Sequence, residues 1–196
     1  MPVVLDGLPV RGEEIPGKDF VMNHGNDFIL IAGIPGTGKS VYSTHLRDRH
    51  GYHYVEADVE MALPGNSFIA EIHPPKSDYV SQRTSRHDRF VLEFGFPPAV
   101  DFLQDILALK SQGARLVWFT ADIDLAKAYF SKANGSSPDQ TETFRAQVEG
   151  IQKMRLPTPD FLIVDGFHGT THLSNTEIDR IVLPRRNCGE DGEGVG

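Results

Sequence analysis

The sequence predicts an α/β fold in which helices cover both faces of a mainly parallel β-sheet. Short apolar runs alternate with amphipathic stretches along the chain, which is the pattern of repeated strand–helix units. A glycine-rich segment follows the first apolar run and precedes a helical pattern. The chain has 196 residues, the size of one ordinary domain. We therefore expect the strands of these units to form one sheet.

Five short apolar runs are predicted to be strands, because they are rich in β-branched and aromatic residues and are bounded by Gly, Asp or Pro. They comprise residues 28–32, 52–56, 90–94, 115–119 and 161–164. The first and the last are almost continuously apolar, which predicts strands that are buried on both faces of a parallel sheet. Phe94, Trp118 and Phe119 are expected to lie in the core.

The stretches between these runs are predicted to be helices from their apolar spacing and their boundary residues. They comprise residues 40–50, 99–112, 123–133, 139–154 and 176–183. Strands that alternate with helices in this way are typical of a parallel sheet between two helical layers.

Residues 25–184 are predicted to form this domain. An N-terminal arm, 1–24, and a flexible tail, 185–196, are expected to flank it, because both ends mix Gly, Pro and charged residues without periodicity. Residues 59–89 fit no simple pattern. A long insertion of this kind after the second strand is where we expect a substrate-binding region.

The composition excludes several classes of protein. Lys and Arg number 19 and Asp and Glu 27, which gives a net charge of −8 and argues against a nucleic-acid partner. Cys188 is the only cysteine, so neither an internal disulfide nor a cysteine-based zinc site is expected. No secretory signal and no membrane-spanning apolar stretch is visible. We therefore expect a cytoplasmic protein without a membrane partner.

The strongest motif is the segment from residue 33 to residue 40, which we call the phosphate loop. It fits the pattern G-x-x-x-x-G-K-[ST] and lies between an apolar run and a predicted helix. Its glycines allow successive backbone amides to surround an anion, and the following helix adds its N-terminal amides. Such a loop predicts a site for ATP and Mg²⁺, with the lysine at the β- and γ-phosphates and the serine at the metal. The residues are Gly33, Ile34, Pro35, Gly36, Thr37, Gly38, Lys39 and Ser40.

Two carboxylates follow or end predicted strands beside this loop. Glu93 lies inside an apolar run, where a buried charge needs a partner, and is expected either to ligate Mg²⁺ or to face solvent at the sheet end. Asp58 follows the second strand, at the edge where ligands of open α/β folds bind. It is expected to orient an attacking substrate hydroxyl and accept its proton, with a turn-forming role as the alternative and Glu60 as the next candidate.

Cations gather in two stretches of this acidic chain. His73, Lys76 and four further basic residues up to Arg89 predict either a pocket for an anionic or polyhydroxyl substrate or a solvated basic face. Residues 123–147 contain Lys127, Lys132 and Arg145 around a Gly- and Ser-rich loop. This lid-like region is expected to neutralise transition-state charge, unless its lysines are ordinary surface residues. The loop at residues 165–169 is expected to flank the adenine.

With these features the chain resembles the P-loop small-molecule kinases of the gluconate and shikimate kinase type, whose fold is that of the nucleoside-monophosphate kinases. The resemblance covers about residues 27–183 and is specific only in the phosphate loop. It implies a five-stranded sheet of order 2-3-1-4-5, Asp58 as the base, and a lid that closes over ATP. Family members usually carry lid arginines, whereas none occurs here between Arg115 and Arg145. Lys127 or Lys132 is expected to replace them.

The sequence thus predicts an ATP- and Mg-dependent phosphotransferase that acts on a small hydroxyl-bearing metabolite. Lys39 and Asp58 are the expected catalytic residues, Ser40 and Glu93 the metal ligands, and Lys127 a further nucleotide contact. The alternatives are a P-loop nucleotide hydrolase or switch, in which water accepts the phosphoryl group, and a non-catalytic nucleotide-binding module.

Overall fold

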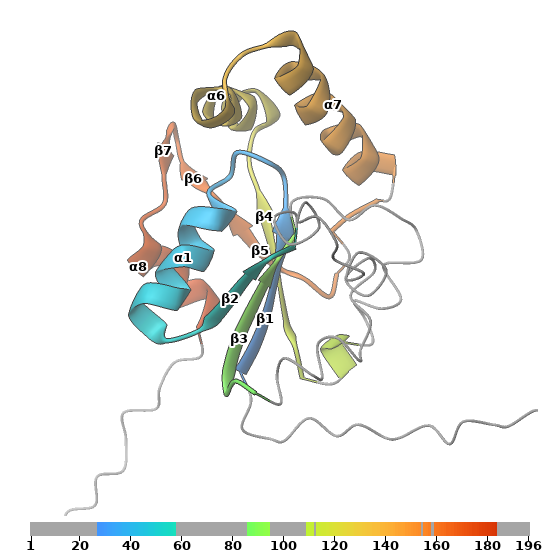
Figure 1. The fold of residues 1–196 in the computed structure, drawn as a ribbon. Coiled ribbons are helices and arrows are strands. Elements are labelled where there is room, and N and C mark those ends of the chain that lie inside the picture. Colours follow the sequence, from blue (N-terminus) through green and yellow to red (C-terminus); the bar gives the residue numbers. More distant parts are fainter. Residues whose placement is uncertain are drawn as a thin grey trace, which may run out of the picture.

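The computed structural model describes residues 27–57, 86–94, 109–111, 113–153, 155–157 and 159–183. The predicted arm, residues 59–85 of the predicted insertion and the predicted tail lie outside the described residues. In the described part, a central sheet lies between helices (Figure 1).

The sheet has five parallel strands in the order β2-β3-β1-β4-β5 (Figure 1). This arrangement confirms the predicted fold class and the strand order that the resemblance implied. Each strand begins or ends within one residue of the predicted run. The strands are β1 (Asp27–Gly33), β2 (His53–Glu56), β3 (Arg89–Glu93), β4 (Arg115–Thr120) and β5 (Leu162–Asp165).

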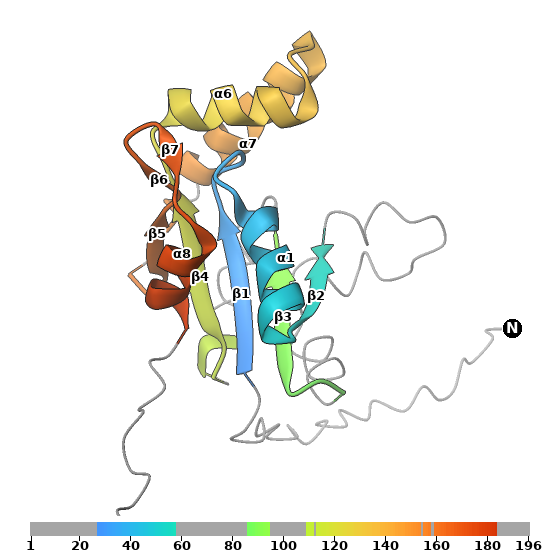
Figure 2. The same ribbon diagram turned by 90° about the vertical axis from the view of Figure 1, so that its left-hand side faces the viewer.

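Apolar residues of the strands pack on both faces of the sheet, because successive strand residues point to opposite sides. Ile29 and Ile31 of β1 pack on the face that carries α1 (Lys39–His50) and α8 (Asn175–Val182), which lie side by side in Figure 2. Phe28 and Leu30 pack on the other face, to which α7 (Pro138–Lys153) contributes apolar residues. The expected core residues Phe94, Trp118 and Phe119 are fully buried between these layers.

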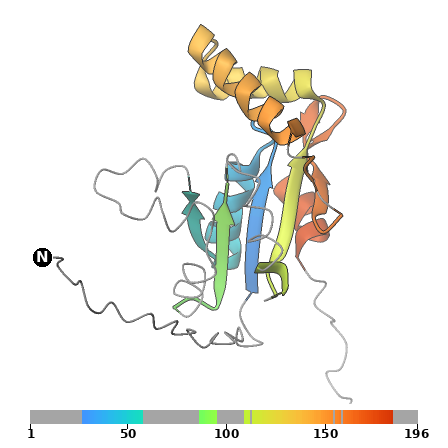
Figure 3. The same cartoon turned by 90° about the vertical axis from the view of Figure 1, so that its right-hand side faces the viewer.

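Helix α6 (Ile123–Asn134) and the start of α7 lie across the carboxyl end of the sheet, above the phosphate loop (Figures 1 and 3). The bounds of α1, α6, α7 and α8 differ from the predicted ranges by one residue at most. Of the predicted helix at 99–112, residues 109–111 are helical and the others lie outside the described residues. None of the helices in the described ranges has the length and apolar character needed to span a bilayer.

Two features of the C-terminal part differ from expectation. The last strand was expected to be buried on both faces, but β5 is an edge strand in which Leu162 and Ile163 are 37% and 46% exposed. Of the residues in this apolar strand only Val164 is buried, so the strand is not covered on both faces. The segment after β5 was expected to be a loop, yet it forms a short hairpin of β6 (Phe167–His168) and β7 (Thr171–His172).

Candidate nucleotide-binding site

The phosphate loop connects β1 to α1 through three glycines with positive φ. Gly33, Gly36 and Gly38 have φ values of 137°, 80° and 90°, a region that other residues rarely adopt. A Cβ on Gly33 would lie 2.1 Å from the Phe119 carbonyl oxygen, so β4 packs directly against the loop. The Thr37 hydroxyl donates a hydrogen bond of 2.7 Å to the Ile34 carbonyl oxygen and closes the turn.

The N-terminus of α1 lacks a side-chain cap. Gly38 occupies its N-cap position, and no side chain accepts hydrogen bonds from its first amides. By contrast, Asp122 caps α6 and Ser174 caps α8 through a capping box. Uncapped amides and the positive end of the helix dipole form an anion site. Helix α1 therefore begins in a way that suits a phosphate group rather than a neighbouring side chain.

Lys39 lies at the centre of this loop and is only 6% exposed. Its Nζ donates hydrogen bonds to the carbonyl oxygens of Gly33 and Ile34, at 3.2 and 3.0 Å. The ammonium group is thus held inside the curve of the loop, beside the uncapped amides. From this position a phosphate group can exchange with the carbonyl oxygens as the acceptor of the lysine's hydrogen bonds.

Ser40, Glu93 and Tyr54 form a hydrogen-bonded chain at the carboxyl ends of the strands. The Ser40 hydroxyl donates to Glu93 Oε1 at 2.6 Å, and the Tyr54 hydroxyl donates to Glu93 Oε2 at 2.8 Å. Burial, and then the charge of Glu93, raise the pKa of the Tyr54 hydroxyl, so it stays a donor. Glu93 is 2% exposed, so the alternative in which it faces solvent does not hold.

Glu93 therefore lies where the sequence predicted a metal ligand, next to the hydroxyl of Ser40. A buried carboxylate and a serine hydroxyl are the oxygen ligands that Mg²⁺ prefers. Tyr54 was missed by the sequence analysis. The period-2 alternation of β2 offered a signal, since Tyr54 precedes the buried Val55 and its polar end must find a partner.

Asp58, the predicted base, lies outside the described residues, as do Glu60 and residues 73–85 of the basic stretch. The described chain reaches Ala57, directly after β2. Glu56 at the end of β2 pairs in register with Glu93 of β3. The described end of β2 therefore lies at the same edge of the sheet as the phosphate loop.

A cavity of about 530 Å³ opens beside the phosphate loop, within the size range of small-molecule sites. Residues of the loop and the start of α1 form one side, and α6 and the hairpin form the other. The lining residues are Gly36, Gly38, Lys39, Ser40, Val41, Tyr129, Phe130, Lys132, Ala133, Asn134 and His172.

Of the two lid lysines, Lys132 lines this cavity and Lys127 does not. Five residues of α-helix correspond to about 500°, so the two side chains leave α6 about 140° apart. Lys132 Nζ lies 5.9 Å from the centre of the Tyr129 ring, in a cation–π contact. Of the two lysines, the described geometry therefore places only Lys132 at the cavity, whereas Lys127 is exposed elsewhere on the helix.

The hairpin brings His172 to the cavity, which the sequence analysis did not foresee. Its ring packs against Phe167 at 4.1 Å and Tyr129 at 4.3 Å between centroids. Burial lowers the pKa of His172, which favours a neutral ring. His168, in the segment expected to flank the adenine, is exposed and does not line the cavity.

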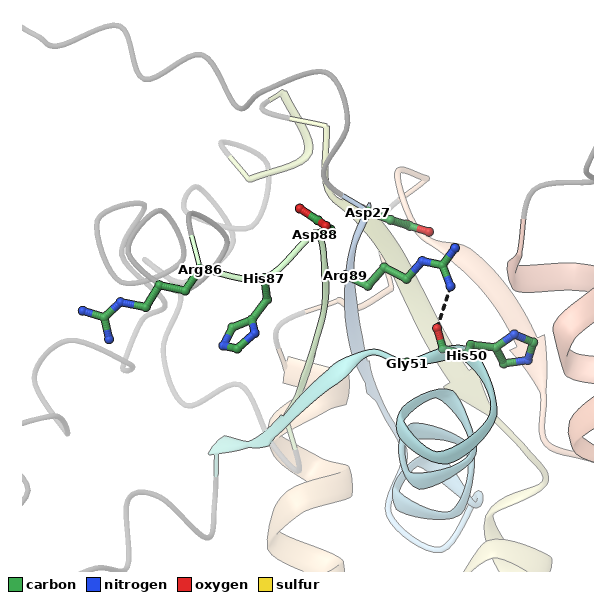
Figure 4. Close-up of a pocket in the computed structure, with 7 residues that line it drawn as sticks. All are labelled: Asp27, His50, Gly51, Arg86, His87, Asp88 and Arg89. Carbon is green, nitrogen blue, oxygen red and sulfur yellow. Dashed lines mark hydrogen bonds between the residues drawn. The ribbon is translucent and has the colours of Figure 1, made fainter.

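A second cavity, of about 820 Å³, lies at the opposite end of the sheet (Figure 4). It is lined by the starts of β1 and β3 and by the end of α1. Two of its charged side chains have structural partners: Arg89 donates to the His50 carbonyl oxygen at 2.6 Å, and Asp27 accepts a hydrogen bond from Arg115 at 2.9 Å. Because ligands of open α/β sheets bind at the carboxyl ends of strands, the cavity at the phosphate loop is the candidate site.

Gly36→Ala is expected to destabilise the protein more than Gly51→Ala. The two glycines have φ values of 80° and 71°, so they share the backbone cost of gaining a Cβ. A Cβ on Gly36 would lie 2.2 Å from the Ala126 carbonyl oxygen of α6, whereas one on Gly51 meets nothing within 4 Å. Urea denaturation should show an extra loss of about 1–3 kcal/mol for Gly36→Ala, the typical cost of overpacking. Equal losses would mean that α6 does not rest on the phosphate loop.

The parallel sheet of order 2-3-1-4-5, with the phosphate loop between its central strand and α1, defines the P-loop kinase fold. No protein-family model matches the chain, and no curated protein sequence matches it. Solved structures do match it by fold. A gluconokinase from Sinorhizobium meliloti 1021 is 17% identical with a TM-score of 0.52, over 82% of this chain and 91% of that one.

Two other solved structures agree. The shikimate kinase from Acinetobacter baumannii in complex with shikimate is 14% identical with a TM-score of 0.53, over 81% of this chain and 93% of that one. The tunicamycin resistance protein of Deinococcus radiodurans is 15% identical with a TM-score of 0.52, over 80% and 93%. At these identities the matches show the fold alone. The chain has the P-loop small-molecule kinase fold that the resemblance implied.

Proposed function

We propose that the protein is an ATP- and Mg-dependent phosphotransferase that acts on a small hydroxyl-bearing metabolite. The observation that carries this proposal is the convergence of three groups at one edge of the sheet. Lys39 lies inside the phosphate loop, the N-terminus of α1 is uncapped, and buried Glu93 accepts a hydrogen bond from Ser40. The kinase fold of the structural neighbours supports the same class of reaction.

The described residues suit the triphosphate. The loop amides and Lys39 would bind the β- and γ-phosphates, and Lys132 across the cavity would add a second cation. Tyr129 and His172 offer aromatic faces at the same cavity, where a purine ring could stack. The cavity of about 530 Å³ is large enough for part of a nucleotide.

The residues present also fit a magnesium ion. Ser40 and Glu93 would hold it, since both offer oxygen atoms on the phosphate side of the sheet. When bound, Mg²⁺ would neutralise charge on the transferred phosphoryl group. The hydrogen bond from Tyr54 would keep the Glu93 carboxylate aimed at Ser40.

Asp58 would activate the acceptor. It is the residue that follows Ala57 in the sequence, two residues after the end of β2. In this proposal Asp58 takes the proton of the acceptor hydroxyl as its oxygen bonds to the γ-phosphorus and the bond to ADP breaks. Residues 59–89 would supply the acceptor contacts. Helices α6 and α7 would form the lid over ATP, with Lys132 in place of the lid arginines of related kinases.

The test is ADP release by the full chain with Mg·ATP and a panel of hydroxylated metabolites. The names of the structural neighbours make gluconate and shikimate the first acceptors to try. We expect fast ADP release only when an acceptor is present. ADP release that no acceptor accelerates would favour the hydrolase or switch, and tight ATP binding without turnover would favour the non-catalytic module. A cytoplasmic location belongs to the same proposal.

A further inference from the structure

A second group of polar side chains lies outside the nucleotide site, between α1 and α8. His45 and His50 come from the C-terminal part of α1, and Asp179 comes from α8, which packs beside it (Figure 2). In Figure 4 the ring of His50 points away from Arg86 and His87 of the second cavity. The three side chains are 16%, 30% and 19% exposed in that order, so they are shielded but reachable.

Both histidines converge on one carboxylate oxygen. His45 Nε2 lies 2.9 Å from Asp179 Oδ2, and His50 Nε2 lies 3.0 Å from the same atom. The three atoms all lie within 4.8 Å of one another. Ligand bonds of about 2.0–2.1 Å in tetrahedral zinc sites separate neighbouring ligand atoms by roughly 3.3–3.5 Å. The two nitrogen–oxygen contacts would widen slightly to admit an ion, and any ligand atoms as far apart as 4.8 Å would move closer together.

The neighbouring side chains already orient these ligands. The Tyr42 hydroxyl donates a hydrogen bond of 3.1 Å to Asp179 Oδ1, the oxygen that the histidines do not use. The His45 ring stacks on the Tyr42 ring with centroids 5.9 Å apart. Hydrogen bonds to a carboxylate and packing of an imidazole fix the geometry of metal ligands in the same way. The cluster thus needs little rearrangement to bind an ion.

We propose that His45, His50 and Asp179 bind a zinc-type divalent ion that clamps α8 to the C-terminal end of α1. Two imidazole nitrogens and one carboxylate suit Zn²⁺ and its transition-metal neighbours, whereas Mg²⁺ prefers oxygen ligands alone. Water would complete the tetrahedron. On binding, the proton on each Nε2 moves to Nδ1 of the same ring or is released to water, and a bond to the ion replaces the hydrogen bond of that nitrogen to Asp179. In the described part of the chain this is the one such cluster of three residues.

The site is independent of the proposed kinase activity, so it can be tested without nucleotide. The full chain, prepared without a polyhistidine tag and stripped with a chelator, is titrated with ZnCl₂ in excess Mg²⁺ by calorimetry. We expect one Zn²⁺ per chain at micromolar affinity. His45→Gln and Asp179→Asn should each weaken binding by about 10- to 100-fold or more. His168→Gln, which removes an exposed imidazole elsewhere, should bind like the wild type.

Thermal unfolding with and without Zn²⁺ tests the same site in variants that are less stable than the wild type. Zn²⁺ should raise the thermal midpoint of the wild type and of His168→Gln, and should leave that of His50→Gln unchanged. Co²⁺ bound to the wild type should give the visible absorption of a tetrahedral nitrogen–oxygen site. The proposal is overturned if all variants bind Zn²⁺ equally, because the ion would then sit elsewhere. It is equally overturned if the wild type binds no more tightly than a His45→Gln/His50→Gln double variant.

Discussion

Replacing Lys39 by alanine should lower kcat by about 100- to 1000-fold, the usual cost of removing one preorganised group that stabilises transition-state charge. The reason is local. Lys39 is the ammonium group inside the phosphate loop, within 3.0 and 3.2 Å of two loop carbonyl oxygens. In the proposed reaction, the positive charge of Lys39 would stabilise the negative charge that develops on the β- and γ-phosphates. Steady-state turnover with the acceptor found in the ADP-release screen measures the effect.

Lys153→Ala is a matched control for this experiment. It removes the same ammonium group from the last turn of α7, where the side chain is 79% exposed. We expect its turnover to equal that of the wild type. Thermal midpoints of both variants would separate lost catalysis from lost stability, because Lys39→Ala also removes two hydrogen bonds. If the folded Lys39→Ala protein turns over ATP normally, the phosphate loop is not the reaction site.

The second large effect concerns the two carboxylates, which should fail in different ways. Asp58→Asn should lower kcat by about 10²- to 10⁴-fold, the range for a general base, and leave Mg·ATP affinity nearly unchanged. Glu93→Gln should shift the Mg²⁺ dependence of both binding and turnover to higher concentration, because the charge at the proposed metal site is lost. Glutamine retains hydrogen-bonding partners for Ser40 and Tyr54, so the fold should survive.

Titration of Mg·ATP and of free Mg²⁺, followed by turnover assays, distinguishes the two roles. Tyr54→Phe is the control for Glu93, because it removes a hydrogen bond from the carboxylate and keeps its charge. We expect only a small shift in Mg²⁺ dependence for this variant. Loss of metal-dependent binding in Asp58→Asn with a silent Glu93→Gln would reverse the assigned roles. Normal turnover in both variants would move the base to another carboxylate, with Glu60 and Asp122 tested next.

The sequence predicted the sheet, its helices and the phosphate loop because local signals carry them. Apolar runs of strand length, glycines at the loop and helix boundaries all act within a few residues of chain. The burial of β5 was wrong for a topological reason. An apolar run does not record whether its strand has one neighbour or two, and β5 lies at the edge of the sheet.

The candidate site was predictable where its residues lie in the phosphate loop or at the end of a predicted strand beside it. Ser40 and Glu93 were expected at one metal site, and the structure joins them by a hydrogen bond of 2.6 Å. His172 was not assigned, because it lies in a hairpin whose strands have two residues each, too few for a strand pattern, although Gly169 with positive φ marks its turn. Either Lys127 or Lys132 was expected to replace the lid arginines, and Lys127 was named as the nucleotide contact. Only the orientation of α6 over the phosphate loop distinguishes them.

The histidine–aspartate cluster shows the same limit more sharply. His45 and His50 are five residues apart, a spacing that does not place side chains on one face of a regular helix. Their rings meet because His50 is the last residue of α1, directly before the left-handed Gly51. Asp179 lies 129 residues further along the chain from His50. A local sequence pattern cannot predict this contact, because it depends on how α8 packs against α1.

The resting position of Lys39 has a consequence for the entropy of nucleotide binding. A lysine that moves freely in the unliganded protein loses up to about 2 kcal/mol of rotamer freedom when a ligand immobilises it. Here Lys39 is only 6% exposed, and its ammonium group already donates hydrogen bonds to the carbonyl oxygens of Gly33 and Ile34. That loss of freedom therefore occurs when the chain folds. In the proposed function, an arriving triphosphate would meet an ordered cation, and less of the attraction between them would be offset by lost side-chain freedom.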